Sequence, residues 1–518
     1  MAASAHASSK PRDGTVLARG AFFNFLAFLA SNLRGIFTFL VARLLGSAAL
    51  GGFGLAWATT DLVSKLGTLG LDTAAIGFVS RAEAAGDRSA SRRIMQSSLL
   101  LALGASTALA ALGFWAAWTI APRLGWRPEL SRATAVMLLA LPGIALYRVS
   151  NALSRGMTVM HHDIYSRGLT ESLGTAAALL LVVALGFRRF APELAAIAGT
   201  LASGLVAFRF AAPLFGASGP APGPGGAAAL RSPAALLRAS APIALYDLLN
   251  IGIMKIDVLM LGLFVGRAPG VTLETLGIYA ASVEVAGGLR KVSQSFTPIF
   301  VPVVARQIGS GQMREAEATY GYLARWMLVL LLPAIAVLAL SGGAILSIFG
   351  PAFREGRVWV AIVGGACALN SFVLLGETIL MIERPRINLF NSSIALAAGI
   401  GLNLWLIPRF GPLGAALGML VPYGLQGLLR GIEITWLFDW HWPWRALAKP
   451  WASALGALPA ALLVRLLLPG LAGEVAAGLL YLAGYLAVWW LIGLDPNDRA
   501  VLAELLRRPA ASPAVIKA

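Results

Sequence analysis

The chain has 518 residues, of which 58% are hydrophobic and only 13% are charged, whereas a soluble domain carries about 25% charged residues. This composition excludes a secreted globular enzyme, and the single cysteine, Cys367, excludes a disulfide scaffold. The net charge of +17 does not indicate nucleic-acid binding, because a basic stripe needs a solvated domain to carry it.

In chain order, a polar stretch of about twenty residues precedes a first apolar segment that is too long for a signal-peptide core and has no small-residue cleavage site behind it. We therefore expect an uncleaved first helix. A span needs about 20 apolar residues, so the composition allows roughly fourteen spans. The apolar stretches that we expect to cross the membrane are 21–45, 53–80, 94–120, 133–154, 172–187, 194–215, 239–266, 276–305, 326–353, 358–376, 387–408, 410–429, 450–468 and 475–494.

The sequence thus predicts an all-α, polytopic membrane protein with two six-helix lobes around a central cavity and two appended C-terminal helices. A Pro/Gly-rich connection forbids a helix between the sixth and seventh spans, and basic residues in alternate connections place both termini in the cytoplasm. The predicted regions are an N-terminal tail at 1–20, an N-lobe at 21–215, a cytoplasmic linker at 216–235, a C-lobe at 236–440, helices 13 and 14 at 441–494, and a cytoplasmic C-terminal tail at 495–518.

The two lobes read as a parallel repeat, because an even number of spans separates the matched helices. At an offset of 225, Gly52 falls on Gly277 and Lys65 on Arg290. We expect Lys65 and Arg290 to face one shared cavity from opposite lobes.

Enzymatic sites are not indicated. No lysine follows a glycine, so a phosphate-cradling Walker loop is excluded. The only clustered histidines, His161 and His162, are adjacent and point apart on a helix, which does not favour a metal site. The sequence therefore predicts no catalytic residue, no resident metal and no cofactor.

Charge inside the second span is the strongest local signal. The free energy of inserting this helix into lipid includes a cost of about 9 kcal/mol for its three charges, Asp61, Lys65 and Asp72. The apolar residues of the helix recover only about 5 kcal/mol. Successive residues of a helix are 100° apart, so all three lie on one face, which must look onto water or partner helices. Two readings stay open: Asp61 and Lys65 neutralise one another as an i,i+4 pair, or the face lines a cavity.

Comparable polar stripes mark the first, seventh and eighth spans. They contain Asn24, Ser31, Arg34 and Thr38; Asp247, Asn250 and Asp257; and Glu284, Lys291 and Ser295. Lys255 and Arg290 point away from these stripes, toward neighbouring helices. Stripes on the first two helices of each lobe imply a hydrated cavity between the lobes, and its cations suit an anionic substrate. The candidate substrate-binding residues are Arg34, Lys65, Arg290 and Lys291.

Two segments carry a family resemblance: LVARLLGSAALGGFGLAWATTDLVSKLGTLGLDTAAIGFVSRA at 40–82 and LGIYAASVEVAGGLRKVSQSFTPIFVPVVAR at 276–306. The first resembles the Ala-Arg-x-Leu-Gly turn, Gly-aromatic helix entry and Leu-Gly-Leu midpoint of the Wzx-type polysaccharide flippases. The second resembles their Gly-x-Tyr-x-x-Ala helix that ends near a proline. These flippases share a superfamily with multidrug and toxic-compound extrusion antiporters and the lipid II flippase.

The resemblance implies a flippase of the bacterial inner membrane that moves a lipid-linked oligosaccharide, on a polyprenyl pyrophosphate carrier, for surface polysaccharide such as the O-antigen of lipopolysaccharide. It implies alternating access driven by H⁺ or Na⁺, membrane lipids as surroundings, and the polysaccharide polymerase and glycosyltransferases of the same pathway as partners. The ion-coupling candidates are Asp61, Asp72, Asp247, Asp257 and Glu284.

Two other functions stay open. A multidrug cation antiporter of the same fold would need an apolar, aromatic cavity with one or two acidic residues, and the accompanying basic residues disfavour it. A membrane-embedded glycan enzyme would need a larger loop outside the membrane than the short outer connections provide.

Overall fold

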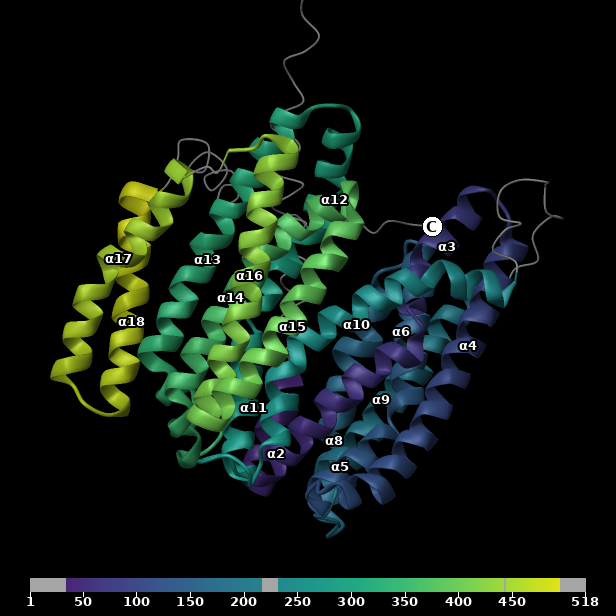
Figure 1. Cartoon of the computed structure of the whole chain (residues 1–518), viewed down its shortest axis with the longest axis horizontal. Helices are drawn as coiled ribbons and strands as arrows, with labels where there is room; N and C mark the ends of the chain where they lie inside the picture. The colour runs from purple at the N-terminus through teal and green to yellow at the C-terminus, as the bar shows by residue number, and fades with distance from the viewer. Residues whose placement is uncertain (1–33, 217–231, 442–443, 494–518) are drawn as a thin grey trace, which may run out of the picture.

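The structure, a computed structural model, describes residues 34–216, 232–441 and 444–493. Both predicted tails, the start of the first expected span and most of the predicted linker lie outside these residues. The described chain is entirely helical, with two groups of helices that meet along α2, α10 and α11 (Figure 1).

The first group is built from seven longer helices and a few short helical turns. Its longer helices are α2 (Arg34–Thr68), α3 (Leu71–Ala84), α4 (Arg88–Trp115), α5 (Pro128–Leu138), α6 (Leu141–Gly156), α8 (Ser172–Ala184) and α9 (Ala191–Ala211). Between α6 and α8 lie the short α7 (His161–Asp163) and the π-helix η3 (Ile164–Glu171).

The second group follows the Pro/Gly-rich connection. It contains α10 (Pro233–Leu263), α11 (Leu273–Gly287), α12 (Arg290–Gly309), α13 (Met313–Ser347), α14 (Arg357–Glu383), α15 (Pro385–Phe410) and α16 (Pro412–Phe438). The last two helices, α17 (Trp444–Leu467) and α18 (Leu471–Val488), pack on α13 at the outer flank of this group (Figure 1).

Breaks in the long helices have local causes. Gly46 has a φ of 86°, which only glycine adopts without strain, and it kinks α2 near its start. Leu69 and Gly70 both have positive φ and separate α2 from α3. At the start of α10, the Ser232 hydroxyl accepts a hydrogen bond from the Ala235 N–H, which satisfies one of the free donors of the first turn.

In the described part of the chain, ten helices are long and apolar enough to cross a membrane, or eleven if the α5–α6 pair, bent by 42°, is one span. The expected total of fourteen is therefore not confirmed. The helices α10 to α12 are not among the ten: α11 has 15 residues, which span only about 22 Å of a hydrocarbon core about 30 Å thick. Charged residues, among them Asp247, Lys255 and Lys291, interrupt α10 and α12.

The C-terminal pair is fixed to the second group by a buried carboxylate. Glu474 of α18 is 2% exposed; it accepts hydrogen bonds from the Ala344 N–H at 2.5 Å and from Arg465 at 2.9 Å. The Tyr485 hydroxyl donates to the Val329 carbonyl at 3.0 Å. Because a lone buried charge is costly, these contacts specify how α17 and α18 dock on α13.

Candidate functional site at the lobe interface

Lys65 lies where the two groups of helices meet. Its Nζ is 2.6 Å from Asp72 Oδ2 on α3 and 3.1 Å from Asp247 Oδ2 on α10. The Thr68 hydroxyl donates to Asp72 Oδ1, and the Thr73 hydroxyl donates to Asp247 Oδ2. One ammonium is thus shared between a carboxylate of its own lobe and one of the other lobe.

A second set of charges lies one turn earlier on α2, with the opposite polarity. Asp61 Oδ1 is 2.5 Å from Arg148 Nη2 on α6, and Asp61 Oδ2 is 3.5 Å from Lys255 Nζ on α10. Lys255 therefore serves a neighbouring helix, as expected. We call Asp61, Lys65, Asp247 and Lys255 the charged contact. The i,i+4 reading of Asp61 and Lys65 is insufficient, because each pairs with charges on other helices.

The second lobe encloses its own polar cluster. Arg290 Nε donates to Cys367 Sγ on α14 at 3.1 Å, and the Tyr279 hydroxyl donates to Asp257 Oδ2 at 2.8 Å. Asp257 and Tyr279 are both fully buried, and Asp257 Oδ1 has no hydrogen-bond partner among the described residues. Arg290 and Lys65 contact different helices, so their observed partners do not place them in one shared cavity.

The lobes also touch directly through backbone. A methyl group on Gly51 would lie 2.8 Å from Gly277 N, and one on Gly277 would lie 3.0 Å from Gly51 N. The carbonyl oxygens of Leu273 and Ser47 would clash with these same two methyl groups. We call Ser47, Gly51, Leu273 and Gly277 the glycine contact. The contact is reciprocal, because each glycine approaches the other glycine and the carbonyl oxygen four residues before it. Two segments related by a two-fold axis meet in this way.

This reciprocity corrects the repeat register. Residues 47 and 51 match 273 and 277 at an offset of 226, one more than the sequence comparison used, and Gly54 meets Ala280 in the same register. The sequence contains a signal for it: Leu50, Gly51 and Phe53 match Leu276, Gly277 and Tyr279. Continued along α2 and across the break between α11 and α12, the register makes Lys291, rather than Arg290, the equivalent of Lys65.

The remaining predicted residues lie elsewhere. Arg34 begins α2, but its side chain is outside what the structure describes. Lys291 is half-buried in the first turn of α12, and Glu284 is exposed on α11.

Sequence reasoning did not identify the partners that lie far along the chain. Arg148 and Lys255 join Asp61, and Arg430 Nη2 is 2.8 Å from Glu377 Oε2, while the Tyr246 hydroxyl donates to the other Glu377 oxygen. An isolated charge in an apolar span was the available signal for each, since such a charge needs a partner.

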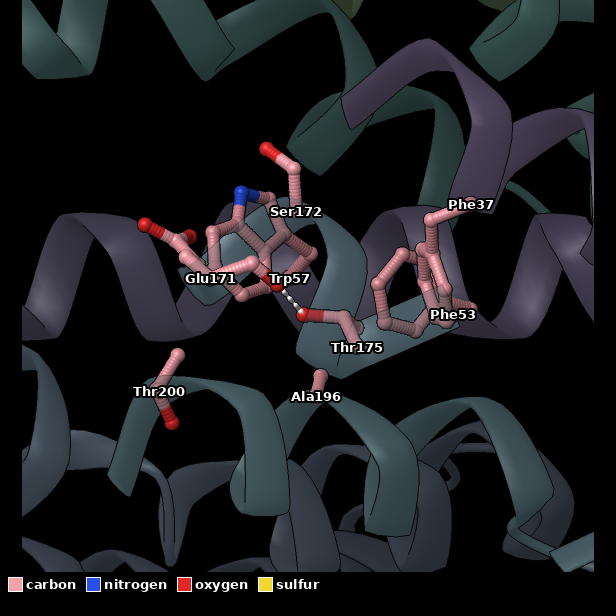
Figure 2. A pocket seen from close by; sticks show the side chains of 8 residues that line it. All are labelled: Phe37, Phe53, Trp57, Glu171, Ser172, Thr175, Ala196 and Thr200. Atoms are coloured by element: carbon pink, nitrogen blue, oxygen red, sulfur yellow. Dashed lines mark hydrogen bonds between the residues drawn. The ribbon is translucent and has the colours of Figure 1, made fainter. Parts of the chain in front are cut away.

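A separate, partly open pocket lies inside the first lobe, between α2, η3, α8 and α9 (Figure 2). It is lined by Phe37, Phe53, Trp57, Glu171, Ser172, Thr175, Ala196 and Thr200. The Thr175 hydroxyl donates to the Glu171 backbone carbonyl, and the Glu171 side chain is buried. The space inside it, about 10 Å³, has room for no more than a water molecule, so this pocket is too small for an oligosaccharide headgroup.

No group of three or more potential metal ligands among His, Cys, Asp and Glu occurs within residues 34–216, 232–441 and 444–493. The charged residues described at the lobe interface offer ammonium and guanidinium groups that bind anions, and carboxylates that bind cations or protons.

Comparisons with known proteins identify the family and the fold. A family model described as "Polysaccharide biosynthesis protein" matches residues 17–306. No curated protein matches the chain. An inward-facing multidrug resistance MATE family transporter of the MOP superfamily is 15% identical, with a TM-score of 0.64 over 80% of this chain and 96% of the other.

Two further solved structures have the same fold. The lipid II flippase MurJ, in an inward closed conformation, is 12% identical, with a TM-score of 0.63 over 94% of this chain and 100% of the other. A MOP superfamily transporter from Pyrococcus furiosus, described as having a binding pocket of reverse polarity, is 14% identical, with a TM-score of 0.61 over 82% of this chain and 96% of the other.

Proposed function

Because the chain belongs to the polysaccharide biosynthesis protein family, we propose that it is a flippase that moves a lipid-linked oligosaccharide across the bacterial inner membrane for surface polysaccharide synthesis. The fold that the chain shares with MOP superfamily transporters supports a transport function over an enzymatic one. The observation that carries the substrate class is Lys65, an ammonium held at the lobe interface between carboxylates of both lobes.

The charge and the geometry favour an anionic headgroup. Lys65 is 18% exposed and can be reached from the interface, and the corrected register places a second lysine, Lys291, at the equivalent position of the other lobe. A diphosphate carries several acceptor oxygens, which two lysines can meet as point charges. The substrate that we propose is therefore an oligosaccharide on a polyprenyl pyrophosphate, with O-antigen as one such glycan.

The transport cycle that we propose is alternating access of the two lobes around a central cavity.

The topology that we propose has fourteen spans, with both termini and the 216–235 linker in the cytoplasm. A cysteine at Ser218 should then react with an impermeant maleimide only from the cytoplasmic side. Labelling only from the periplasm would reject this topology.

Ion coupling is proposed to use H⁺ or Na⁺. Asp257 is the best supported carrier, since it is fully buried and one of its oxygens has no hydrogen-bond partner among the residues that the structure describes. Asp61, Asp72 and Asp247 are engaged with cations, so coupling through any of them would require its ion pair to open.

A flux assay in liposomes tests the function. We expect transport of a fluorescent prenyl-diphosphate oligosaccharide and no transport of a cationic dye. Lys65→Ala and Lys291→Ala should each lower glycolipid flux about tenfold or more, because a buried anion without a counter-ion is costly. Arg92→Ala, at an exposed position of α4, is the matched loss of one positive charge and should leave flux unchanged.

The multidrug cation antiporter is the alternative. Transport of the cationic dye without any transport of the glycolipid would favour it. Normal glycolipid flux in both lysine variants at normal protein level would instead reject the proposed role of the two lysines.

A further inference from the structure

The two carboxylates that hold Lys65 are not equivalent. Asp72 is 6% exposed, belongs to the same lobe and is the closer partner at 2.6 Å. Asp247 is 18% exposed, belongs to α10 and lies at 3.1 Å. An anion that approaches Lys65 from the interface therefore meets Asp247 as the accessible competitor, while Asp72 stays in place beneath the ammonium.

We propose that Asp247 is a built-in competitor of the substrate: it occupies Lys65 in the unloaded transporter, and the diphosphate of the glycolipid displaces it. This inference rests on the proposed function and deepens it. An ammonium has three donors and no directional preference for carboxylate over phosphate. A diphosphate beside Lys65 would stand next to the Asp247 carboxylate, and two anions in one poorly solvated site repel strongly. Asp247 must then move away.

Displacement of Asp247 has a consequence for the lobes. Asp247 is carried by α10, whereas Lys65, Asp72 and Thr73 belong to α2 and α3, so its departure removes a contact between the two groups of helices. The nearby Lys255–Asp61 contact has the opposite polarity, with the cation on α10. Substrate binding and opening of the Lys65–Asp247 ion pair are thereby one event, which is how a ligand shifts a conformational equilibrium.

The inference predicts that a variant without the competitor binds the headgroup more tightly. We would measure binding of farnesyl diphosphate, a short prenyl diphosphate, to the full-length protein in nanodiscs. Asp247→Asn should lower the dissociation constant about five- to tenfold, within the usual range of coupling between two sites. Asp247→Glu keeps the charge and should bind as the wild type does. Lys65→Gln should bind at least about tenfold more weakly.

Lys255→Gln is the matched control. It also removes an α10 charge that contacts α2, but it frees no cation at Lys65. If general loosening of the lobes raised the affinity, this variant would bind more tightly too. We expect affinity within about twofold of the wild type, below the usual coupling between two sites, because Lys255 contacts Asp61 and not Lys65. Inorganic pyrophosphate and farnesol, tested separately, distinguish free diphosphate from a lipid headgroup.

A second measurement leaves the four residues of the charged contact unchanged, so it does not depend on the folding of Asp247 variants. Spin labels on cysteines at Arg88 of α4 and Arg386 of α15, both exposed, report the separation of the lobes while Cys367 stays buried. Farnesyl diphosphate should change the distance distribution, and farnesol should not.

The outcomes separate the two proposals. Wild-type binding that weakens in Lys65→Gln but is unchanged in Asp247→Asn would reject the competitor and leave the flippase proposal intact. Equal affinity gains in Asp247→Asn and Lys255→Gln would also reject it. No binding of either diphosphate by the wild type or by Asp247→Asn would overturn both.

Discussion

The glycine contact and the charged contact join the same helix, α2, to the second lobe in different ways. At Gly51, backbone meets backbone, and no space remains for even one methyl group. About three and four turns further along α2, Asp61 and Lys65 meet α10 through side-chain charges. A backbone contact has no substitute partner, whereas an ion pair can exchange one partner for a charged ligand. The first contact is suited to hold the lobes together, and the second is suited to respond to substrate.

The largest expected loss of stability comes from a substitution in the charged contact. Asp61→Ala leaves Arg148 and Lys255 without their shared carboxylate, and removal of one member of a buried pair costs about 3–5 kcal/mol. We expect that loss in the free energy of unfolding, measured by denaturant titration in detergent.

The partners of Asp61 supply the control for that variant. Asp61→Leu combined with Arg148→Met and Lys255→Met removes the whole group and should recover much of the stability. Asp61→Asn combined with Lys65→Gln should not, because it still strands Arg148. If stability recovered in this second combination and not in the first, Asp61 and Lys65 would neutralise one another as a self-contained pair.

An intermediate effect is expected at the glycine contact. Gly277→Ala forces α2 and α11 apart, and overpacking of this kind costs about 1–3 kcal/mol. Only the conformation that contains this contact pays that cost, so the population should shift toward the alternate arrangement. The spin-label pair at Arg88 and Arg386 measures the shift.

The matched control is Gly287→Ala, also in α11, where an added methyl group meets nothing within 4 Å. Gly52→Ala, next to Gly51 but equally open, serves the same purpose on α2. The comparison between the two contacts fails if these open glycines shift the lobes as much as Gly277 does.

The smallest effect is expected for Lys255→Gln. Lys255 lies 3.5 Å from Asp61, its side chain is 21% exposed, and Asp61 retains Arg148. We expect a loss of stability of no more than about 1 kcal/mol, as for most partly solvated pairs. A loss comparable to that of Asp61→Ala would mean that Lys255, and not Arg148, is the main partner.

The sequence by itself determined the class of protein and the helices that matter. Apolar runs predict a polytopic helical membrane protein, and the cost of Asp61, Lys65 and Asp72 in lipid predicts that one face of the second span meets water or partners. These conclusions depend on local composition and on the 100° step between residues of a helix, which are properties of a single segment. The repeat was also detectable, although its offset was one residue short.

Only the tertiary structure decided which charges meet. Asp61 joins Arg148, 87 residues away, and Lys65 joins Asp247, 182 residues away. No local rule selects one partner among several buried cations, because helix packing brings them together. The register of 226 likewise became certain only at Gly51 and Gly277, where the two backbones approach one another, whereas Gly52, which an offset of 225 would match with Gly277, has open space around it.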